Sequence, residues 1–541
     1  MLLVLLAILA LFILEENIRG RVTLSRYQAE LRAKGEKLTL VEMNLPKVPT
    51  EGNGAPALLE AANQLAPLTR TNQLWRSGLK MMRFVAPGCA RVLYREEVPA
   101  DWVAWPAHPL DRRQKRGGRQ SYESEDYLTY SWDDLSEKIA AVSSILEKAR
   151  TAARQPTLAV ELDYANGLRG QSLHSMDVLY LRNWFAAAAI DALRKGNLED
   201  ALENIVTIAE LTRLQKGERI VGAQQSRIWA ASGGLRLTWE ALQAGGWTDN
   251  QLVKLQESWQ KADCLPDFVP SMEMARLLCV QAYSPDRLKK LLDGGELPYE
   301  IEYRRVDWAD ISAYILSRLG FGSFSAEGLQ QRVGNSLNDR WYTTQLTMRF
   351  LIWRMAWLQQ DEAIAIHGWQ ENLDGARVVA KQKSWAAWSV RSDRRWTFYD
   401  RWRRLQPGGS YDCDDQIQEA ARYETMREMT VAAIVLKRYQ LRTGKPPADL
   451  SALVPEFLPE LPHDWMDGKP LCYRLKADGT FTLYSVGDNG RDDGGNPTPP
   501  VPTGSMSSIG EMWRGLDAVW PAPATREEIE AYESKIYGRK R

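Results

Sequence analysis

Apolar residues recur at helical spacing through the middle of the chain, with polar residues between them. Over residues 131–150, one helical face carries Leu135, Ile139, Val142, Leu146 and Ala149. The same spacing marks residues 178–192 and 198–211, and the Lys195-Gly196-Asn197 link between them suits a left-handed helix end. Further helices are predicted at 220–243, at 249–262 after a Thr248 capping box, and at 270–283. The pattern therefore predicts a mainly α fold, with a helical-hairpin domain over residues 131–300.

An unbroken apolar run from Leu2 to Leu14 opens the chain and is followed by Glu15 and Glu16. As a helix this run covers about 20 Å, which is less than the roughly 30 Å hydrocarbon core of a bilayer. A cleavable signal needs a basic segment before the run and small residues after it, and the sequence has neither. An uncleaved signal anchor or short transmembrane segment over residues 1–14 is therefore preferred to a cleaved signal. A buried core helix is the other alternative, although such a helix usually keeps a polar face. We thus expect contact with a membrane through residues 2–14.

Two further regions are marked by composition, one by helix-breaking residues and the other by tryptophans. Residues 15–130 are predicted to hold a juxtamembrane helix and then a Pro/Gly-rich irregular region. Residues 301–410 form a Trp-rich helical region, because eight of the 21 tryptophans lie between Trp341 and Trp402. Trp353 and Trp357 share a helical face. Such periodic pairs favour core packing over an exposed surface that stacks sugars or peptides.

Near the C-terminus the pattern changes to α+β. Residues 411–500 are predicted as a separate module, and residues 501–541 as a tail with a short helix. Apolar spacing predicts a helix over 415–443 that stops at Gly444. Asp478-Gly479 separates two alternating runs, which is typical of a β-hairpin.

Tyr, Gly, Pro, Leu, Ser and Asp residues within 415–500 match a family pattern. They are Tyr439, Gly444, Pro447, Leu450, Leu453, Pro462, Asp464, Gly468, Pro470, Tyr473, Gly479, Tyr484, Ser485, Gly487, Asp488 and Gly490. Taken together they make this module resemble the C-terminal half of the major pseudopilin of bacterial type II secretion. In pseudopilins the hydrophobic helix runs straight into the module, whereas here a long region intervenes. Polymerisation into a pseudopilus is therefore not expected.

The chain as a whole resembles a group of large, uncharacterised bacterial single-span proteins with an N-terminal anchor, a helical middle and this pseudopilin-like end. That resemblance implies a location at the bacterial cell membrane with the body outside the cytoplasm. Arg19, Arg21 and Arg26 follow the apolar run, and the positive-inside rule would instead place the body in the cytoplasm. The orientation therefore stays open. The segment Ala192–Ala201 also resembles the joint of a tetratricopeptide repeat, with the hairpin covering about residues 178–214.

The turn Gly487–Asn496 concentrates carboxylate and amide side chains. Hard oxygen ligands in a flexible turn are what Ca²⁺ requires. Pseudopilins hold calcium in the loop after this strand, so the resemblance implies Asp488, Asp492 and Asp493 as the metal ligands. The spacing is not that of an EF-hand. A solvated acidic turn without metal is the alternative.

Charge and residue counts exclude several classes of function. Lys+Arg and Asp+Glu both number 69, and zero net charge removes the default attraction to nucleic acid. The five cysteines include no Cys-x-x-Cys spacing, so a structural zinc site is unsupported. The four histidines are scattered, and the sequence contains no zincin, nucleophile-elbow, Walker or dinucleotide motif. We therefore predict no catalytic residue and no organic cofactor.

Three hypotheses for function follow. The first is a membrane-anchored, extracytoplasmic interaction or scaffold protein without enzymatic activity, because helical hairpins offer concave surfaces to protein partners. The second is an accessory component of a type II secretion or pilus-like system. The third is a carboxylate-dependent envelope hydrolase, because 69 acidic residues leave room for a catalytic pair.

Overall fold

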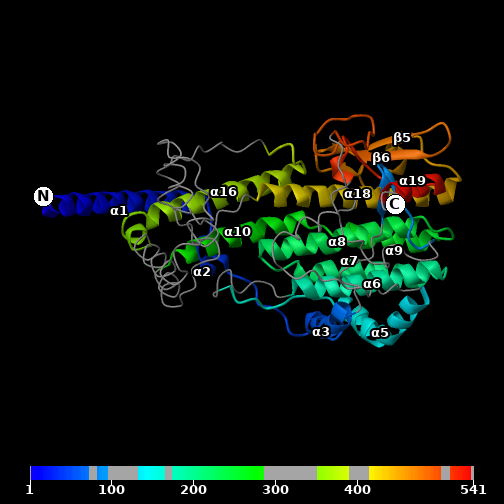
Figure 1. Cartoon of the computed structure of the whole chain (residues 1–541), viewed down its shortest axis with the longest axis horizontal. Coiled ribbons are helices and arrows are strands. Elements are labelled where there is room, and N and C mark those ends of the chain that lie inside the picture. Colours follow the sequence, from blue (N-terminus) through cyan, green and yellow to red (C-terminus); the bar gives the residue numbers. More distant parts are fainter. Residues whose placement is uncertain are drawn as a thin grey trace, which may run out of the picture.

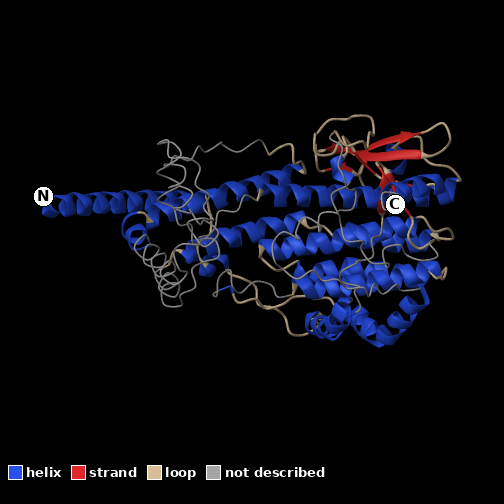
Figure 2. Cartoon of the chain, viewed as in Figure 1, coloured by secondary structure: helices blue, strands red, loops and turns tan. Residues whose placement is uncertain are grey.

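A computed structural model of the chain describes residues 2–71, 82–95, 132–164, 174–284, 350–388, 413–500 and 512–537. Within these ranges the chain is mainly helical with a small β content (Figure 2). The α-helices are α1 (Leu2–Ala33), α2 (Leu40–Met43), α3 (Ala55–Thr71), α5 (Trp132–Ala153), α6 (Ser175–Arg194), α7 (Leu198–Leu211), α8 (Val221–Leu242), α9 (Asp249–Gln260), α10 (Leu265–Ala282), α16 (Leu358–Gln382), α18 (Asp414–Thr443) and α19 (Arg526–Tyr537). Short 3₁₀ helices are η3 (Thr212–Gln215), η4 (Leu450–Leu453) and η5 (Met512–Arg514).

The strands form three small sheets. They are β1 (Arg83–Ala86), β2 (Cys89–Arg91), β3 (His463–Asp464), β4 (Lys469–Pro470), β5 (Cys472–Leu475), β6 (Phe481–Ser485), β7 (Ala518–Val519) and β8 (Ala522–Pro523). β5, β6 and β7 pair antiparallel, and so do β3 and β4. In the third sheet, β2 pairs antiparallel with β1 and parallel with β8. The C-terminal segment therefore joins two sheets that are far apart in sequence.

The helices stack in layers beneath the small sheets (Figure 1). The β5–β6 hairpin packs on α18, α18 packs on α8 and α9, and α8 packs on α6 and α7. On the far side α6 contacts α3 and α5. One hydrophobic cluster runs through all these layers, from Ala55 to Ala518. Apolar burial in this shared core is the main favourable contribution to folding.

Several elements predicted from spacing are confirmed. α6 and α7 form an antiparallel hairpin, and Asn197 caps α7 by accepting from the Asp200 amide. The Thr248 capping box at the start of α9 is present, with reciprocal bonds to Gln251. α18 ends at Gly444, whose φ of 77° is the left-handed conformation that glycine adopts without strain. The β5–β6 hairpin turns at Asp478-Gly479 as predicted.

The N-terminal helix α1 corrects the predicted fold, because the expected N-terminal membrane helix is wrong. Among the residues that the structure describes, no helix is both long enough and apolar enough to cross a membrane. The apolar run stops at Glu15, and the following half of α1 packs on α16. The buried Glu16 carboxylate accepts from Trp357 Nε1 at 3.1 Å and from Gln360 Nε2 at 2.8 Å. Most side chains from Leu3 to Leu14 are exposed, and Figure 1 shows this part of α1 extending beyond the helical body.

Candidate functional site

Helix α8 lies at the centre of the helical body, yet it carries many polar residues. α6, α7, α10 and α18 all contact it. A helix surrounded in this way is usually apolar on every side. Gln225, Trp229, Gly233, Arg236 and Glu240 recur at intervals of three or four residues, so they share one face of the helix. We call these five residues the α8 polar face; it lies where α6 and α18 approach α8.

A carboxylate of α18 holds the first part of the α8 polar face. Glu419 Oε1 accepts from Trp229 Nε1 at 2.8 Å, and Glu419 Oε2 accepts from Gln225 Nε2 at 2.5 Å. The Trp229 side chain is nevertheless 45% exposed. Its ring is therefore fixed in orientation while much of its surface remains open.

An arginine from α6 occupies the middle of the face. The Arg182 guanidinium lies against Gly233, where an added Cβ would be 2.7 Å from Nη1 and 3.0 Å from Cζ. The Nε of Arg182 is buried without a hydrogen-bond partner, and within the described part of the chain no ion pair joins this side chain to a carboxylate. Burial lowers the pKa of Arg182 to about 10, and the neighbouring Arg236 cation lowers it as well.

The far end of the face is closed by the segment after β2. Glu240 is completely buried, and its Oε1 accepts from the Tyr94 amide at 2.8 Å. Burial raises the pKa of Glu240 to about 8, although backbone N–H groups oppose that rise. The Lys437 ammonium donates to the Ala244 carbonyl at 2.9 Å just beyond the end of α8. Cations at a helix C-terminus are favourable, so this end is structural.

Taken together, these contacts describe a binding surface. Its middle holds the Arg182 guanidinium, near a fixed indole ring. Guanidinium groups bind carboxylate and phosphate but neither accept nor transfer protons near neutral pH. The arrangement therefore fits recognition of an anionic group next to an apolar or aromatic one.

The predicted calcium ligands lie in one turn but face different partners. Asp488 accepts from Arg422 Nε at 2.8 Å, Asp492 accepts from the Tyr484 hydroxyl at 2.9 Å, and Asp493 accepts from Asn489 Nδ2 at 2.7 Å. Across the described ranges, no group of three or more His, Cys, Asp or Glu residues could hold a metal ion. The calcium site stays a prediction.

The residue that organises this turn is Asp517, which was not predicted from the sequence. Its buried carboxylate accepts from the amides of Asp493 at 3.2 Å and of Gly495 and Asn496 at 2.8 Å. These hydrogen bonds to a protein side chain fix the conformation of the turn. No local pattern could identify Asp517, because its partners are more than twenty positions away in the sequence.

The tryptophans of the predicted Trp-rich region that the structure describes pack in or against the core. Trp353, Trp357 and Trp369 are 1%, 3% and 6% exposed, and Trp385 and Trp388 are partly buried against the same cluster. Trp341 and Trp402, which bounded that region, lie outside the described residues. Trp229, the exposed tryptophan of the α8 polar face, is elsewhere. In the sequence, the feature that could have indicated Trp229 is the row of polar residues at intervals of three or four along α8, a helix whose neighbours are apolar.

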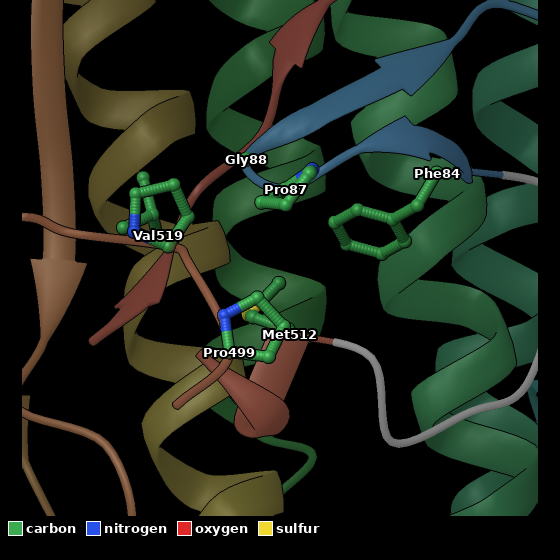
Figure 3. A pocket seen from close by; sticks show the side chains of 7 residues that line it. Phe84, Pro87, Gly88, Pro499, Met512 and Val519 are labelled. Carbon is green, nitrogen blue, oxygen red and sulfur yellow. The ribbon is translucent and has the colours of Figure 1, made fainter. Parts of the chain in front are cut away.

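A small pocket near the chain's C-terminal segment is a packing gap. Phe84 and Pro87 from the β1–β2 hairpin face Pro499, Met512 and Val519 across it (Figure 3). It encloses about 10 Å³, which is at the lower limit for a single water molecule. It is too small for an organic ligand.

No protein-family model, no curated protein and no solved structure matches this chain.

Proposed function

We propose that the chain is a non-enzymatic interaction protein that holds a segment of a protein partner against the α8 polar face. The observation that carries this proposal is Trp229. It is a large aromatic residue on a central helix, 45% exposed, with its indole N–H fixed by Glu419. Tryptophans with a fixed ring are the residues that most often dominate the energy of a protein interface.

Other tryptophans of the helical body show what core packing looks like here. Trp239 is 0% exposed and donates to the Pro521 carbonyl, and Trp259 is 0% exposed and donates to the Thr238 hydroxyl. Both bury the whole ring as well as the N–H group. Trp229 satisfies its N–H group in the same way but leaves its ring open. That difference favours a docking role over a role in the core.

The charges beside Trp229 indicate the kind of partner. The Arg182 guanidinium of α6 lies against Gly233 of this face, and it has no carboxylate partner in the part of the chain that the structure describes. A partner segment that combines an acidic side chain with an apolar one would complement this surface.

The experiment places a photo-crosslinking residue in the full-length chain in its source cells. Position 232, on the same side of α8, is the test site; position 441 on α18, where Leu441 is 51% exposed, is the matched control. We expect a crosslinked protein at position 232 and none at position 441. The partner identified in this way is then purified for binding measurements.

The binding step uses Trp229→Ala and the control Leu441→Ala. Loss of a central aromatic contact should weaken the Kd at least about tenfold, whereas the control should bind as the wild type does. Equal crosslinking at both positions, or an unchanged Kd for Trp229→Ala, would refute the proposal.

A further inference from the structure

Glu419 on α18 is a carboxylate whose hydrogen-bond partners are neutral side chains. Its Oε1 accepts from Trp229 Nε1 at 2.8 Å, and its Oε2 accepts from Gln225 Nε2 at 2.5 Å. The residue is partly exposed, and within the described part of the chain no Lys, Arg or His side chain forms an ion pair with it. The two oxygens of a carboxylate accept about four hydrogen bonds. The bonds from Trp229 and Gln225 therefore leave Glu419 open to further donors.

Other partly exposed carboxylates in the structure are paired with arginine. Arg438 Nε lies 2.7 Å from Asp249, and Arg377 Nη2 lies 2.8 Å from Glu273. Such charge-assisted bonds are stronger than bonds between neutral groups. Glu419 differs from these carboxylates, because no cation of the described chain matches its charge.

The negative charge lies at the N-terminal end of the α8 polar face. The Gln225 side chain is 8% exposed, and its Oε1 has no hydrogen-bond partner. This amide oxygen adds to the negative potential around Glu419, because Gln225 donates to that carboxylate through the other atom of the same amide group. The Arg182 cation comes from α6 and lies against Gly233, about one turn further along α8 than Trp229. The face therefore carries one charge of each sign.

The ring of Trp229 is available to a cation from outside the chain. The residue is 45% exposed, and in the part of the chain that the structure describes neither a second ring nor a cation lies over it. Arginines do lie over other aromatic rings of this protein, since Arg194 is 4.6 Å from the centroid of Trp132. Cations are attracted to the face of an aromatic ring, and the indole ring attracts them most strongly.

The hydrogen bond between Trp229 and Glu419 fixes the relative position of ring and carboxylate. Because the indole N–H points in the plane of the ring, Glu419 lies at the edge of the ring and leaves its faces free. Arginine and lysine combine an apolar stem with a cationic head. When such a stem lies across the indole ring, its head reaches the carboxylate at the edge. A guanidinium group then donates two parallel N–H bonds to the carboxylate, and an ammonium group forms a point contact with it.

We propose that Trp229 and Glu419 form a binding site for a basic side chain, arginine or lysine, of the protein that docks on the α8 polar face. This inference rests on the proposed function, because it concerns the same face. It identifies the apolar group that lies on Trp229 as the stem of that basic side chain. Gln225 is a positioning residue, because it holds the carboxylate of Glu419 in place.

The test uses the full-length chain labelled with fluorotryptophan, in which each of the 21 tryptophans gives a fluorine NMR signal. Trp229→Phe identifies the signal of Trp229. The probes are the N-acetyl methylamides of arginine, lysine and norleucine, titrated separately at constant ionic strength. Norleucine has the aliphatic stem without the charge and is the matched neutral probe.

For the wild type we expect at least one basic probe to shift the Trp229 signal saturably, with a Kd of roughly millimolar order. Norleucine should bind at least about fivefold more weakly, because it lacks the cation. Glu419→Gln keeps the size of the side chain and removes its charge, so it should abolish this preference. Glu460→Gln is the control, because it removes an equal charge from a side chain that is 74% exposed outside the α8 polar face. It should keep the preference of the wild type.

The outcomes separate the alternatives. A shift with the arginine probe alone identifies a guanidinium ligand, and a shift with the lysine probe alone identifies an ammonium ligand; either supports the site. Equal binding of norleucine, or no saturable shift with either basic probe, overturns it in the wild type without any variant. A preference that survives Glu419→Gln, or that Glu460→Gln also abolishes, overturns it as well.

The proposed function and the basic side-chain site can fail separately. If Trp229→Ala leaves partner binding unchanged while the wild type still prefers the basic probes, the proposed function fails and the site stands. If Trp229→Ala weakens partner binding but the basic probes give no shift, the site fails and the proposed function stands.

Discussion

Glu36 ties the end of α1 to two other helices. Its Oε2 accepts from Arg276 Nη1 at 2.7 Å on α10, and both terminal nitrogens of Arg377 on α16 donate to its carboxylate. Gln370 Nε2 adds a bond at 3.2 Å. The Glu36 side chain is 9% exposed and that of Arg276 is 0% exposed. The perturbation that tests this cluster is Glu36→Gln, which keeps the shape and removes the charge.

The magnitude follows from the pKa of Glu36. Burial opposes ionisation, but the bonds from Arg377 and Arg276 prevail and lower its pKa from 4.5 to about 2. That difference corresponds to about 3 kcal/mol in favour of the charged form, and solvent around the half-open Arg377 reduces it to about 2 kcal/mol. Breaking a buried pair also leaves Arg276 unmatched, which adds to the loss. We expect Glu36→Gln to lower the free energy of unfolding by about 2–4 kcal/mol at pH 7.

The pH dependence gives this prediction its sign. Because the folded pKa lies below the unfolded one, the stabilisation is complete above about pH 4.5 and is lost as the pH falls through about 2. Chemical denaturation followed by circular dichroism should therefore show a large difference between wild type and Glu36→Gln at pH 7 and a smaller one at pH 3. The control is Glu30→Gln, whose exposed pair with Lys34 should contribute nothing measurable. A loss below about 1 kcal/mol, or a difference that is the same at both pH values, would refute the reasoning.

Three other predictions concern packing, the chain ends and the acidic turn. Gly54→Ala should destabilise the fold by about 2–4 kcal/mol, because its Cβ would be 2.0 Å from the Ala152 carbonyl oxygen; Gly368→Ala, with open space around it on α16, should be neutral or stabilising in the same thermal melts. Deleting residues 518–541 removes β7 and β8 and should yield a protein that aggregates in size-exclusion chromatography, because the edge of β6 loses its partner. If the acidic turn binds calcium as predicted, millimolar Ca²⁺ should raise the melting temperature of wild type but not of Asp492→Asn; an unchanged melting temperature of wild type would contradict the metal site.

Elements set by local patterns are those that the sequence predicts well. α18 begins at Asp414 and ends at Thr443, against a predicted 415–443, because apolar spacing and the following glycine both act within a few residues. The α9 capping box and the β5–β6 hairpin are local in the same sense. In each case the residues that decide the structure are neighbours in the sequence.

Contacts between distant segments explain what the sequence could not predict. The apolar run of α1 resembles an anchor in the sequence. In the structure, Glu16 just after the run accepts a hydrogen bond from Trp357, 341 positions away. The sequence predicts the C-terminal segment as a tail, whereas in the structure Ala522 pairs with Cys89 in a parallel ladder. Pairings of this kind depend on the whole packed arrangement, and periodicity contains no information about them.

The same limit applies to the candidate site. The three aspartates predicted as metal ligands do lie in one turn, because they are close in sequence. The α8 polar face was missed, because Arg182 comes from a different helix and because Trp229 gains its meaning only from its exposure. The row of polar residues along α8 was visible in the sequence. It indicates a functional face only once the positions of the neighbouring helices are known.

Helix α18 lies between the β5–β6 hairpin and the α8 polar face. Glu424 on α18 accepts from the amides of Cys264 and Leu265 at the start of α10, and Arg438 donates to Asp249 at the start of α9. These bonds join two helix N-termini, where a carboxylate is favourable, to one long helix. Because Glu419 on the same helix fixes the ring of Trp229, any shift of α18 would move the proposed docking residue with it. If the α8 polar face holds a partner as proposed, substitutions that loosen α18 should weaken partner binding even when they lie far from α8.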